Sequence, residues 1–299
     1  MTVLITGSTG FIGSALIPVL QREGHTVKRL LRSPTASAQD LVWDPASGQL
    51  DRSRLEGLDA VIHLAGESIA EGRWTLGKKA RIRESRIQGT SLLSQTLAGL
   101  SLPPKVLVSA SAMGYYGDRG SEILSEDSNS GNGFLAEVCR EWEAATAPAV
   151  EKGIRVVHLR FSLILSKAGG ALAKMLLPFR MGAGGRIGSG KQYWSWIAID
   201  DLISVILHVL ISNSLQGPVN VATPNPVTNA EFTEVLGKVL KRPTLFPMPA
   251  FAARLAFGEM ADPLLLCSAR LQPSRLIAVN FEFQYPELEG ALHHLLQVD

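Results

Sequence analysis

The 299-residue sequence has few cysteines, little excess charge and no long hydrophobic run. Its two cysteines, Cys139 and Cys267, lie far apart, so no disulfide framework and no cysteine-based metal site is indicated. The six histidines do not cluster with carboxylates at ligand spacing. We therefore expect no metal site, and we expect two reduced thiols in a cytoplasmic protein.

The charge balance argues against further classes of function. A formal net charge of +2 gives no reason to expect a polyanionic partner. The densest basic run, residues 78–83, is explained more simply as a solvated helix face. The longest apolar stretch, residues 202–211, is too short to span a bilayer, and the N-terminus shows no leader pattern. We expect neither a nucleic-acid partner nor a membrane partner.

The composition is that of a globular protein, with 46% apolar and 19% charged residues. The length suits one two-lobed domain or two small domains. What stands out is a glycine-rich turn near the N-terminus, which follows an apolar run and precedes apolar residues at helical spacing. This strand–turn–helix context is typical of a dinucleotide-binding turn.

Each glycine of this turn has a separate physical role. Gly7 permits the tight turn, Gly10 lets the backbone approach a pyrophosphate, and Gly13 lets the helix pack closely on the strand. Free N–H groups at the positive end of the helix can hold phosphates. The cofactor contacts predicted in this stretch are Gly7, Thr9, Gly10, Phe11, Ile12 and Gly13.

The residues after the second predicted strand, 26–31, indicate which dinucleotide binds. NAD enzymes carry an acidic residue about 20 positions past the glycines, where it accepts a hydrogen bond from the ribose. Here Leu31 and Arg32 occupy the strand end, and no acid follows until Asp40. Because a planar arginine cation suits a phosphate, we predict that the cofactor is NADP(H) and that Leu31 and Arg32 contact it.

Two further strands end in residues suited to ligand binding. The strand at 58–66 ends in Leu64, Ala65 and Gly66, whose small side chains leave room for adenine and ribose. His63 in this strand is better explained as a core histidine than as a catalyst. The strand at 105–109 ends in hydroxyl side chains, beginning with Ser109, and the carboxyl edge of a parallel sheet is where ligands bind.

The alternation of strands and helices predicts an α/β fold, with a Rossmann-like doubly wound parallel sheet and a smaller C-terminal substrate lobe. We assign 1–165, with 194–223 returning to it, to the NADP-binding domain, and 166–193 with 224–299 to the smaller lobe. Further predicted elements are helices at 74–100, from 134, 200–211, 228–240 and from 287, strands at 155–160, 194–197 and 219–221, a polar loop at 120–133 and a mobile glycine-rich stretch at 182–190. Asp200 and Asp201 are predicted to cap one helix, and Thr228 with Glu231 to form a capping box on another.

Together these residues resemble the extended, atypical short-chain dehydrogenase/reductase superfamily. The motifs that carry the resemblance are Gly7-x-x-Gly10-x-x-Gly13, Asp59-x-Val61-x-His63-Leu64-Ala65, Gly89-Thr90, Ser109 to Ser111, and Asp200-Asp201. Others resemble the epimerase-family, sugar-nucleotide-epimerase-like subfamily with a C-terminal domain of unknown function: Arg73-Trp74, Gly114-Tyr115-Tyr116-Gly117, Trp142-Glu143, Gly188-Ser189-Gly190 and Tyr285-Pro286-Glu287-Leu288. The resemblance implies NADP(H) binding and a small-molecule substrate, with nucleotide sugars among the candidates.

The sequence departs from this superfamily at its catalytic pair, a tyrosine with a lysine four residues later. None of the four tyrosines has a lysine at that spacing, and the resemblance aligns the pair with Leu135 and Cys139. Arg86 stands where the superfamily has an asparagine. It is either a cofactor contact that replaces the lysine charge or a surface cation, and Arg140 is a weaker candidate. We predict both arginines as cofactor contacts.

Two functions remain open at this point. One is an NADP(H)-dependent oxidoreductase or nucleotide-sugar epimerase with a rearranged acid/base, for which Tyr115 or Tyr116 beside Ser109 and Ser111 are the candidate catalytic residues. The alternative is a catalytically inert NADP(H)-binding sensor or regulatory protein. The missing pair favours the alternative, whereas the complete C-terminal lobe favours an enzyme. The sequence leaves the oligomeric state open.

Overall fold

The computed structural model of the chain describes residues 1–33, 37 and 40–297. In this part of the chain the main feature is an eight-stranded sheet in the order β12-β8-β6-β5-β1-β2-β3-β4. Its pairs are parallel except for β3 with β4, which is antiparallel. The strands are β1 (Thr2–Thr6), β2 (Thr26–Leu31), β3 (Leu41–Asp44), β4 (Gln49–Leu50), β5 (Ala60–His63), β6 (Val106–Ala112), β8 (Arg155–Phe161) and β12 (Gly217–Val221).

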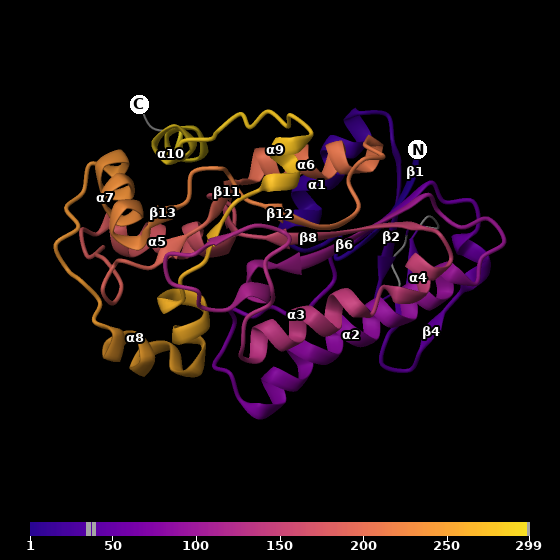
Figure 1. Cartoon of the computed structure of the whole chain (residues 1–299), viewed down its shortest axis with the longest axis horizontal. Helices are drawn as coiled ribbons and strands as arrows, with labels where there is room; N and C mark the ends of the chain where they lie inside the picture. The colour runs from indigo at the N-terminus through magenta and orange to yellow at the C-terminus, as the bar shows by residue number, and fades with distance from the viewer. Residues whose placement is uncertain (34–36, 38–39, 298–299) are drawn as a thin grey trace.

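Helices cover both faces of this sheet (Figure 1). One face carries α1 (Phe11–Arg22) and α6 (Ile199–Ile211), and the other carries α2 (Leu76–Ala98), α3 (Phe134–Ala144) and α4 (Ala147–Glu151). Because side chains alternate along a strand, Val3 and Ile5 pack in the core on the α1 side and Leu4 packs on the α2 side. The predicted fold class, a doubly wound parallel sheet, is confirmed.

The strand order reverses between β1 and β5, the two strands at the centre of the sheet. The connection after β1 runs to α1 on one face, and the connection after β5 runs to α2 on the other. Ligands of open α/β sheets bind at such a switch point, beyond the carboxyl ends of the strands. The topology therefore directs attention to residues 7–10 and 64–67.

The C-terminal part gathers at one end of the sheet, where α5, α7, α8 and α10 lie in Figure 1. Three short strand pairs lie outside the eight-stranded sheet: β9 with β11, β10 with β13 and β7 with β14. The strands of these pairs are β7 (Ile123–Leu124), β9 (Leu163–Leu165), β10 (Tyr193–Trp194), β11 (Trp196–Ala198), β13 (Val227–Thr228) and β14 (Arg270–Leu271). The helices of the C-terminal part are α5 (Gly170–Arg180), α7 (Asn229–Leu240), α8 (Ala250–Phe257), α9 (Ser274–Ala278) and α10 (Leu288–Leu296).

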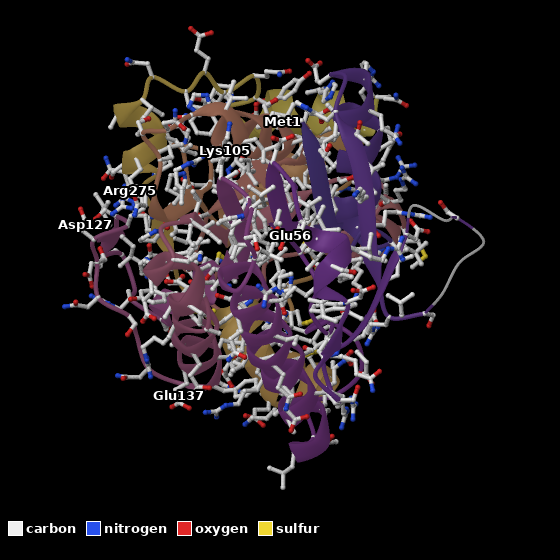
Figure 2. The ribbon with its side chains drawn as sticks, turned by 90° about the vertical axis from the view of Figure 1, so that its right-hand side faces the viewer. Met1, Glu56, Lys105, Asp127, Glu137 and Arg275 are labelled. Atoms are coloured by element: carbon white, nitrogen blue, oxygen red, sulfur yellow. The ribbon has the colours of Figure 1, made fainter. Side chains whose placement is uncertain are left out.

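Shorter helical turns complete the chain: η1 (Arg52–Leu55), η2 (Met113–Tyr116), η3 (Gly258–Met260) and η4 (Asp262–Leu266). The loop predicted at 120–133 contains the short strand β7, which pairs with β14 and so joins this loop to the C-terminal part. Asp127 of the loop and Arg275 of α9 lie next to each other at the surface, 3.4 Å apart (Figure 2). The division of the chain into two domains stays a prediction.

One predicted cap is confirmed and another is wrong. Thr228 and Glu231 form the predicted capping box at the start of α7. In contrast, α6 has Ala198 as its N-cap, and no side chain of the described residues caps it. The buried Asp201 carboxylate instead accepts hydrogen bonds from the backbone N–H groups of Gln284 (2.7 Å) and Tyr285 (3.0 Å). Asp201 thus fixes the C-terminal tail against α6.

The strand predicted at 194–197 is also corrected, because it is divided at Ser195 into β10 and β11. The Ser195 hydroxyl donates to the Ala269 carbonyl and accepts from the Leu271 N–H, both at 2.8 Å. These hydrogen bonds hold the chain at the point where it passes from the β10–β13 pair to the β11–β9 pair. Trp194 and Trp196 on either side of Ser195 are buried in the core.

Candidate functional site

The glycine turn after β1 is too tight for larger residues. Gly7 has a φ of +67°, and a Cβ there would lie 2.7 Å from the carbonyl carbon of Leu64. A Cβ on Gly13 would lie 2.4 Å from the Gly7 carbonyl oxygen, which also accepts the Gly10 N–H at 3.0 Å. Real Cβ atoms do not approach backbone this closely, so the turn requires glycine at positions 7 and 13.

The start of α1 offers unpaired hydrogen-bond donors. Gly10 is the N-cap, and no side chain in the described part of the chain caps the helix. The first N–H groups of a helix have no partner within it and lie at its positive end. The Ser8 hydroxyl beside them is buried and has no hydrogen-bond partner among the described residues. Since buried polar groups are normally paired, these donors fit a bound pyrophosphate.

The opposite wall of the turn is held by Thr6. Its Oγ1 accepts the N–H groups of Leu64 and Ala65, both at 3.1 Å, and lies 2.7 Å from His63 Nδ1. His63 Nε2 lies 2.9 Å from Thr90 Oγ1 on α2. Burial lowers the pKa of His63 to about 4, so its imidazole is neutral at physiological pH. The histidine has the structural role that the sequence favoured.

Cations surround the end of β2. Arg32 is exposed there, while Asp40, the nearest acid in the sequence, accepts two hydrogen bonds from Arg29, at 2.8 and 2.5 Å. A hydrogen bond from Lys78 at 2.7 Å lowers the pKa of Glu67, and the charges of Arg81 and Arg32 add to this effect. Because these cations outnumber the single carboxylate of Glu67, the corner is suited to a phosphate group.

Arg86 of α2 lies against the segment that follows β5 and is half-buried. Its Nη1 donates to the carbonyl oxygens of Glu67 and Ile82, both at 3.0 Å. Its guanidinium carbon lies 4.9 Å from the centre of the Trp142 ring, and a Cβ on Gly66 would lie 3.3 Å from it. Burial lowers the pKa of this guanidinium. Arg86 therefore points toward the carboxyl end of β5.

The α3 face that would carry the usual catalytic pair instead packs against the segment that follows β6. The Cys139 sulfur lies 3.8 Å from the Ala112 carbonyl oxygen, and a Cβ on Gly114 would lie 3.1 Å from the Leu135 Cβ. Burial raises the pKa of the Cys139 thiol to about 12, and the nearby charge of Arg86 opposes this shift. The Arg86 charge therefore lies close to the position that the resemblance assigns to the lysine.

Arg140, the next residue on α3, points away from this face. It is exposed, and its Nη1 donates to Ser130 Oγ at 3.2 Å and to the Gly131 carbonyl at 3.0 Å. The structure thus places Arg32 after β2 and Arg86 beside the end of β5, while Arg140 holds the surface loop before α3.

A buried polar network lies below the loop that follows β6. Arg160 donates to both oxygens of Glu143, at 2.8 and 2.9 Å, and Ser111 donates to Glu143 at 2.7 Å. Arg160 also donates at 2.9 Å to the Tyr116 hydroxyl, which donates at 2.7 Å to Asn220. The sequence analysis missed this network. Its signal in the sequence was a second arginine, Arg160, near the carboxyl end of the strand Arg155–Phe161.

The four candidate catalytic residues differ in how their hydroxyls are used. Those of Ser111 and Tyr116 belong to the network, and burial raises the pKa of Tyr116 to about 12. The hydroxyl of Ser109 is buried and lies 3.5 Å from the Ala110 carbonyl. Tyr115 is half-buried with its ring 3.5 Å from the Arg160 guanidinium, and its hydroxyl makes no hydrogen bond to the described residues. Of the four, Tyr115 has the most available hydroxyl.

Two other kinds of feature are absent from residues 1–33, 37 and 40–297. No group of three or more histidine, cysteine, aspartate or glutamate side chains in these ranges is arranged to hold a metal ion. No helix in the same ranges is long and apolar enough to cross a membrane.

The chain is similar to known proteins over nearly its whole length. Residues 3–222 match the NAD dependent epimerase/dehydratase family, and residues 248–295 match a domain of unknown function (DUF1731). The Epimerase family protein Mb2239 of Mycobacterium bovis is 43% identical over 290 residues, which cover 97% of this chain and 96% of that protein.

Two solved structures are also similar. The human epimerase family protein SDR39U1, solved with NADPH, is 35% identical with a TM-score of 0.91 and 99% coverage of both chains. The nucleoside-diphosphate sugar epimerase of Corynebacterium glutamicum is 38% identical with a TM-score of 0.82, over 99% of this chain and 58% of that one. With this family match, the glycine turn and the parallel sheet, the chain belongs to the NAD dependent epimerase/dehydratase family.

Proposed function

We propose that this protein binds NADPH in the crevice between the β1 and β5 ends and acts as an oxidoreductase on a small organic molecule. The observation that carries the proposal is a donor-lined turn with a cation on each side, Arg32 and Arg86. The NADPH bound to the human relative supports this cofactor. When bound, NADPH supplies a hydride.

Each part of the crevice has a binding task in this proposal. The N–H groups at the start of α1, with Ser8, hold the pyrophosphate. Arg32 pairs with the 2′-phosphate, since a guanidinium matches phosphate geometry. Leu31 and the segment 64–66 border the adenosine. Arg86 replaces the missing lysine and holds the ribose on the nicotinamide side with charge-assisted hydrogen bonds.

The site lacks the usual side chains for proton transfer. A positioned general acid or base contributes roughly 10²- to 10⁴-fold to a rate, and the α3 face holds Leu135 and Cys139 at the usual positions. Tyr115 is the proposed substitute because its hydroxyl is the one left available. Its ring centre lies 3.5 Å from the Arg160 guanidinium, a cation–π contact that holds the side chain in place.

A second candidate is an epimerase that acts on a nucleotide sugar, for which the cofactor would have to be the oxidised form, NADP+, so that a hydride could be taken from the sugar and returned to it. The name of the Corynebacterium relative favours this reading. The two candidates are separated by assaying a panel of UDP- and dTDP-sugars with the native protein and with Tyr115→Phe. The inert sensor alternative gains no support from the family or its relatives.

The binding proposal is tested by calorimetric titration with NADPH. Gly13→Ala should abolish binding, because its Cβ would lie 2.4 Å from the Gly7 carbonyl oxygen. Gly290→Ala is the matched control, since a Cβ there meets no atom of the described chain within 4 Å. Circular dichroism establishes that both variants are folded. A native protein that does not bind NADPH contradicts the proposal.

A further inference from the structure

A small apolar cavity lies between the sheet edge and the C-terminal part. Its volume is about 40 Å³. Met113 and Leu163 line it from the sheet side, Met175 and Trp194 from α5 and β10, and Leu264 and Leu265 from η4. The side chains that line it are thus drawn from the sheet edge and from three separate parts of the C-terminal region.

The cavity lies close to the proposed cofactor site. A Cβ on Gly169 would lie 2.8 Å from the Phe11 ring, so the start of α5 touches the start of α1, where the pyrophosphate is proposed to bind. Met175 is five residues further along α5 than Gly170, or about 7.5 Å at 1.5 Å per residue. Met113 directly follows β6, at the carboxyl edge of the sheet. A molecule in this cavity is therefore near the path of a bound dinucleotide.

Polar side chains next to the cavity wall are already paired within the protein. The Gln192 amide donates to the carbonyls of Ile187 and Leu265, at 2.9 and 3.1 Å. The Ser195 hydroxyl, next to Trp194, donates to the Ala269 carbonyl and accepts from the Leu271 N–H. A sugar ring placed in the cavity would consequently leave hydroxyl groups without partners, which opposes binding.

The size of the cavity also argues against a sugar ring. One water-sized group needs roughly 10–15 Å³ of such volume, so about three groups fit, such as the propyl chain of 2-pentanone with its carbonyl at the mouth of the cavity. This is a short aliphatic body and far less than a hexose. Leucine and methionine walls favour burial of apolar surface, and methionine side chains adapt to the shape of what they contact.

We propose that this cavity is the acceptor subsite, and that it takes a small uncharged carbonyl compound with an aliphatic body and excludes a hexose. This inference rests on the proposed NADPH-dependent function. It names the substrate class of that same site.

Methionine methyl NMR tests the inference directly with the NADPH-saturated protein. Titration with 2-pentanone should shift the methyl signals of Met113 and Met175 to saturation. The signal of Met181, at the exposed end of α5, is the internal control and should not move. UDP-glucose should leave all of these signals in place.

A matched pair of variants adds a second readout. Met175→Gln places an amide in the apolar wall and should weaken the binding of 2-pentanone tenfold or more, measured by the shift of Met113. Met181→Gln makes the same change at an exposed position, and its affinity for 2-pentanone should equal that of the native protein.

Three results overturn the inference: UDP-glucose shifts Met113 and Met175, 2-pentanone fails to shift them, or Met175→Gln binds 2-pentanone as tightly as the native protein does. A failure of the proposed function is distinguishable, because it appears in the calorimetric titration as absent NADPH binding, whichever methyl signals move.

Discussion

The Arg160 guanidinium forms a two-point ion pair with the Glu143 carboxylate, and the two side chains are 3% and 12% exposed. Burial raises the pKa of Glu143, but the hydrogen bonds and charge of Arg160 outweigh it, so the net shift is downward. Arg160 also bonds to Tyr116, which links β8 to the loop after β6. This pair joins α3 to β8 below the loop that follows β6.

Glu143→Gln should destabilise the protein by about 3 kcal/mol, because removing one partner leaves a buried charge without its counterion. Glu141→Gln is the matched control on the same helix. It breaks an exposed pair with Arg83 and should cost no more than about 1 kcal/mol. Urea unfolding measures both. Equal losses in the two variants would mean that burial of the Glu143 pair has no energetic consequence.

Acid should weaken the same ion pair. Since the folded pKa of Glu143 is lowered, its stabilisation is complete above the unfolded value of about 4.3 and is lost as the pH falls through the folded pKa. The difference in unfolding free energy between the native protein and Glu143→Gln should shrink over this window. A difference that stays constant down to pH 2 contradicts the assignment.

His63 should also lower the stability of the protein on acidification, over a higher pH range than Glu143 does. Its folded pKa is about 4 because it is buried, whereas an unfolded histidine titrates near 6.5. Between these values the unfolded chain binds a proton that the folded chain does not, so stability falls as the pH is lowered from about 6.5 to 4. NMR titration should place the His63 midpoint near 4, and a midpoint near 6.5 would show that the imidazole is accessible.

Arg32→Asp should remove or invert the preference for NADPH over NADH. The change replaces a cation suited to the 2′-phosphate with a carboxylate suited to the ribose hydroxyls. Lys191→Asp makes the same charge change at an exposed position in the C-terminal part, and its cofactor preference should match that of the native protein. Calorimetry with both dinucleotides measures the ratio. Equal affinity of the native protein for both cofactors would refute the role of Arg32.

Arg86→Ala should weaken NADPH binding by about tenfold or more, as the loss of a charge-assisted hydrogen bond does. Arg83→Ala is the control, because it removes an exposed arginine one turn away on α2. Its dissociation constant should equal the native value. If Arg86→Ala binds NADPH as tightly as Arg83→Ala, the side chain only holds the backbone at Glu67 and Ile82.

The sequence predicted the features that depend on neighbouring residues. The glycine turn at 7–13, the strand Thr26–Leu31 and the capping box of Thr228 and Glu231 are local patterns, and the structure has each of them. The predicted residue contacts to NADPH stay predictions. They depend on where a bound dinucleotide lies.

Features that depend on distant partners were not predictable in this way. Glu143, Arg160 and Asn220 meet only after three separate elements pack together. Asp201 has the sequence context of a helix cap, but the tail at 284–285 competes for its carboxylate and takes it. Periodicity contains no information on such pairings.

Arg86 is proposed to take over the task of the missing lysine, and a crystal structure of the NADPH complex is the decisive test. In that complex we expect an Arg86 guanidinium nitrogen within hydrogen-bond distance, roughly 2.7–3.2 Å, of the ribose on the nicotinamide side. A complex in which Arg86 contacts only the carbonyls of Glu67 and Ile82, while another side chain holds that ribose, would contradict it.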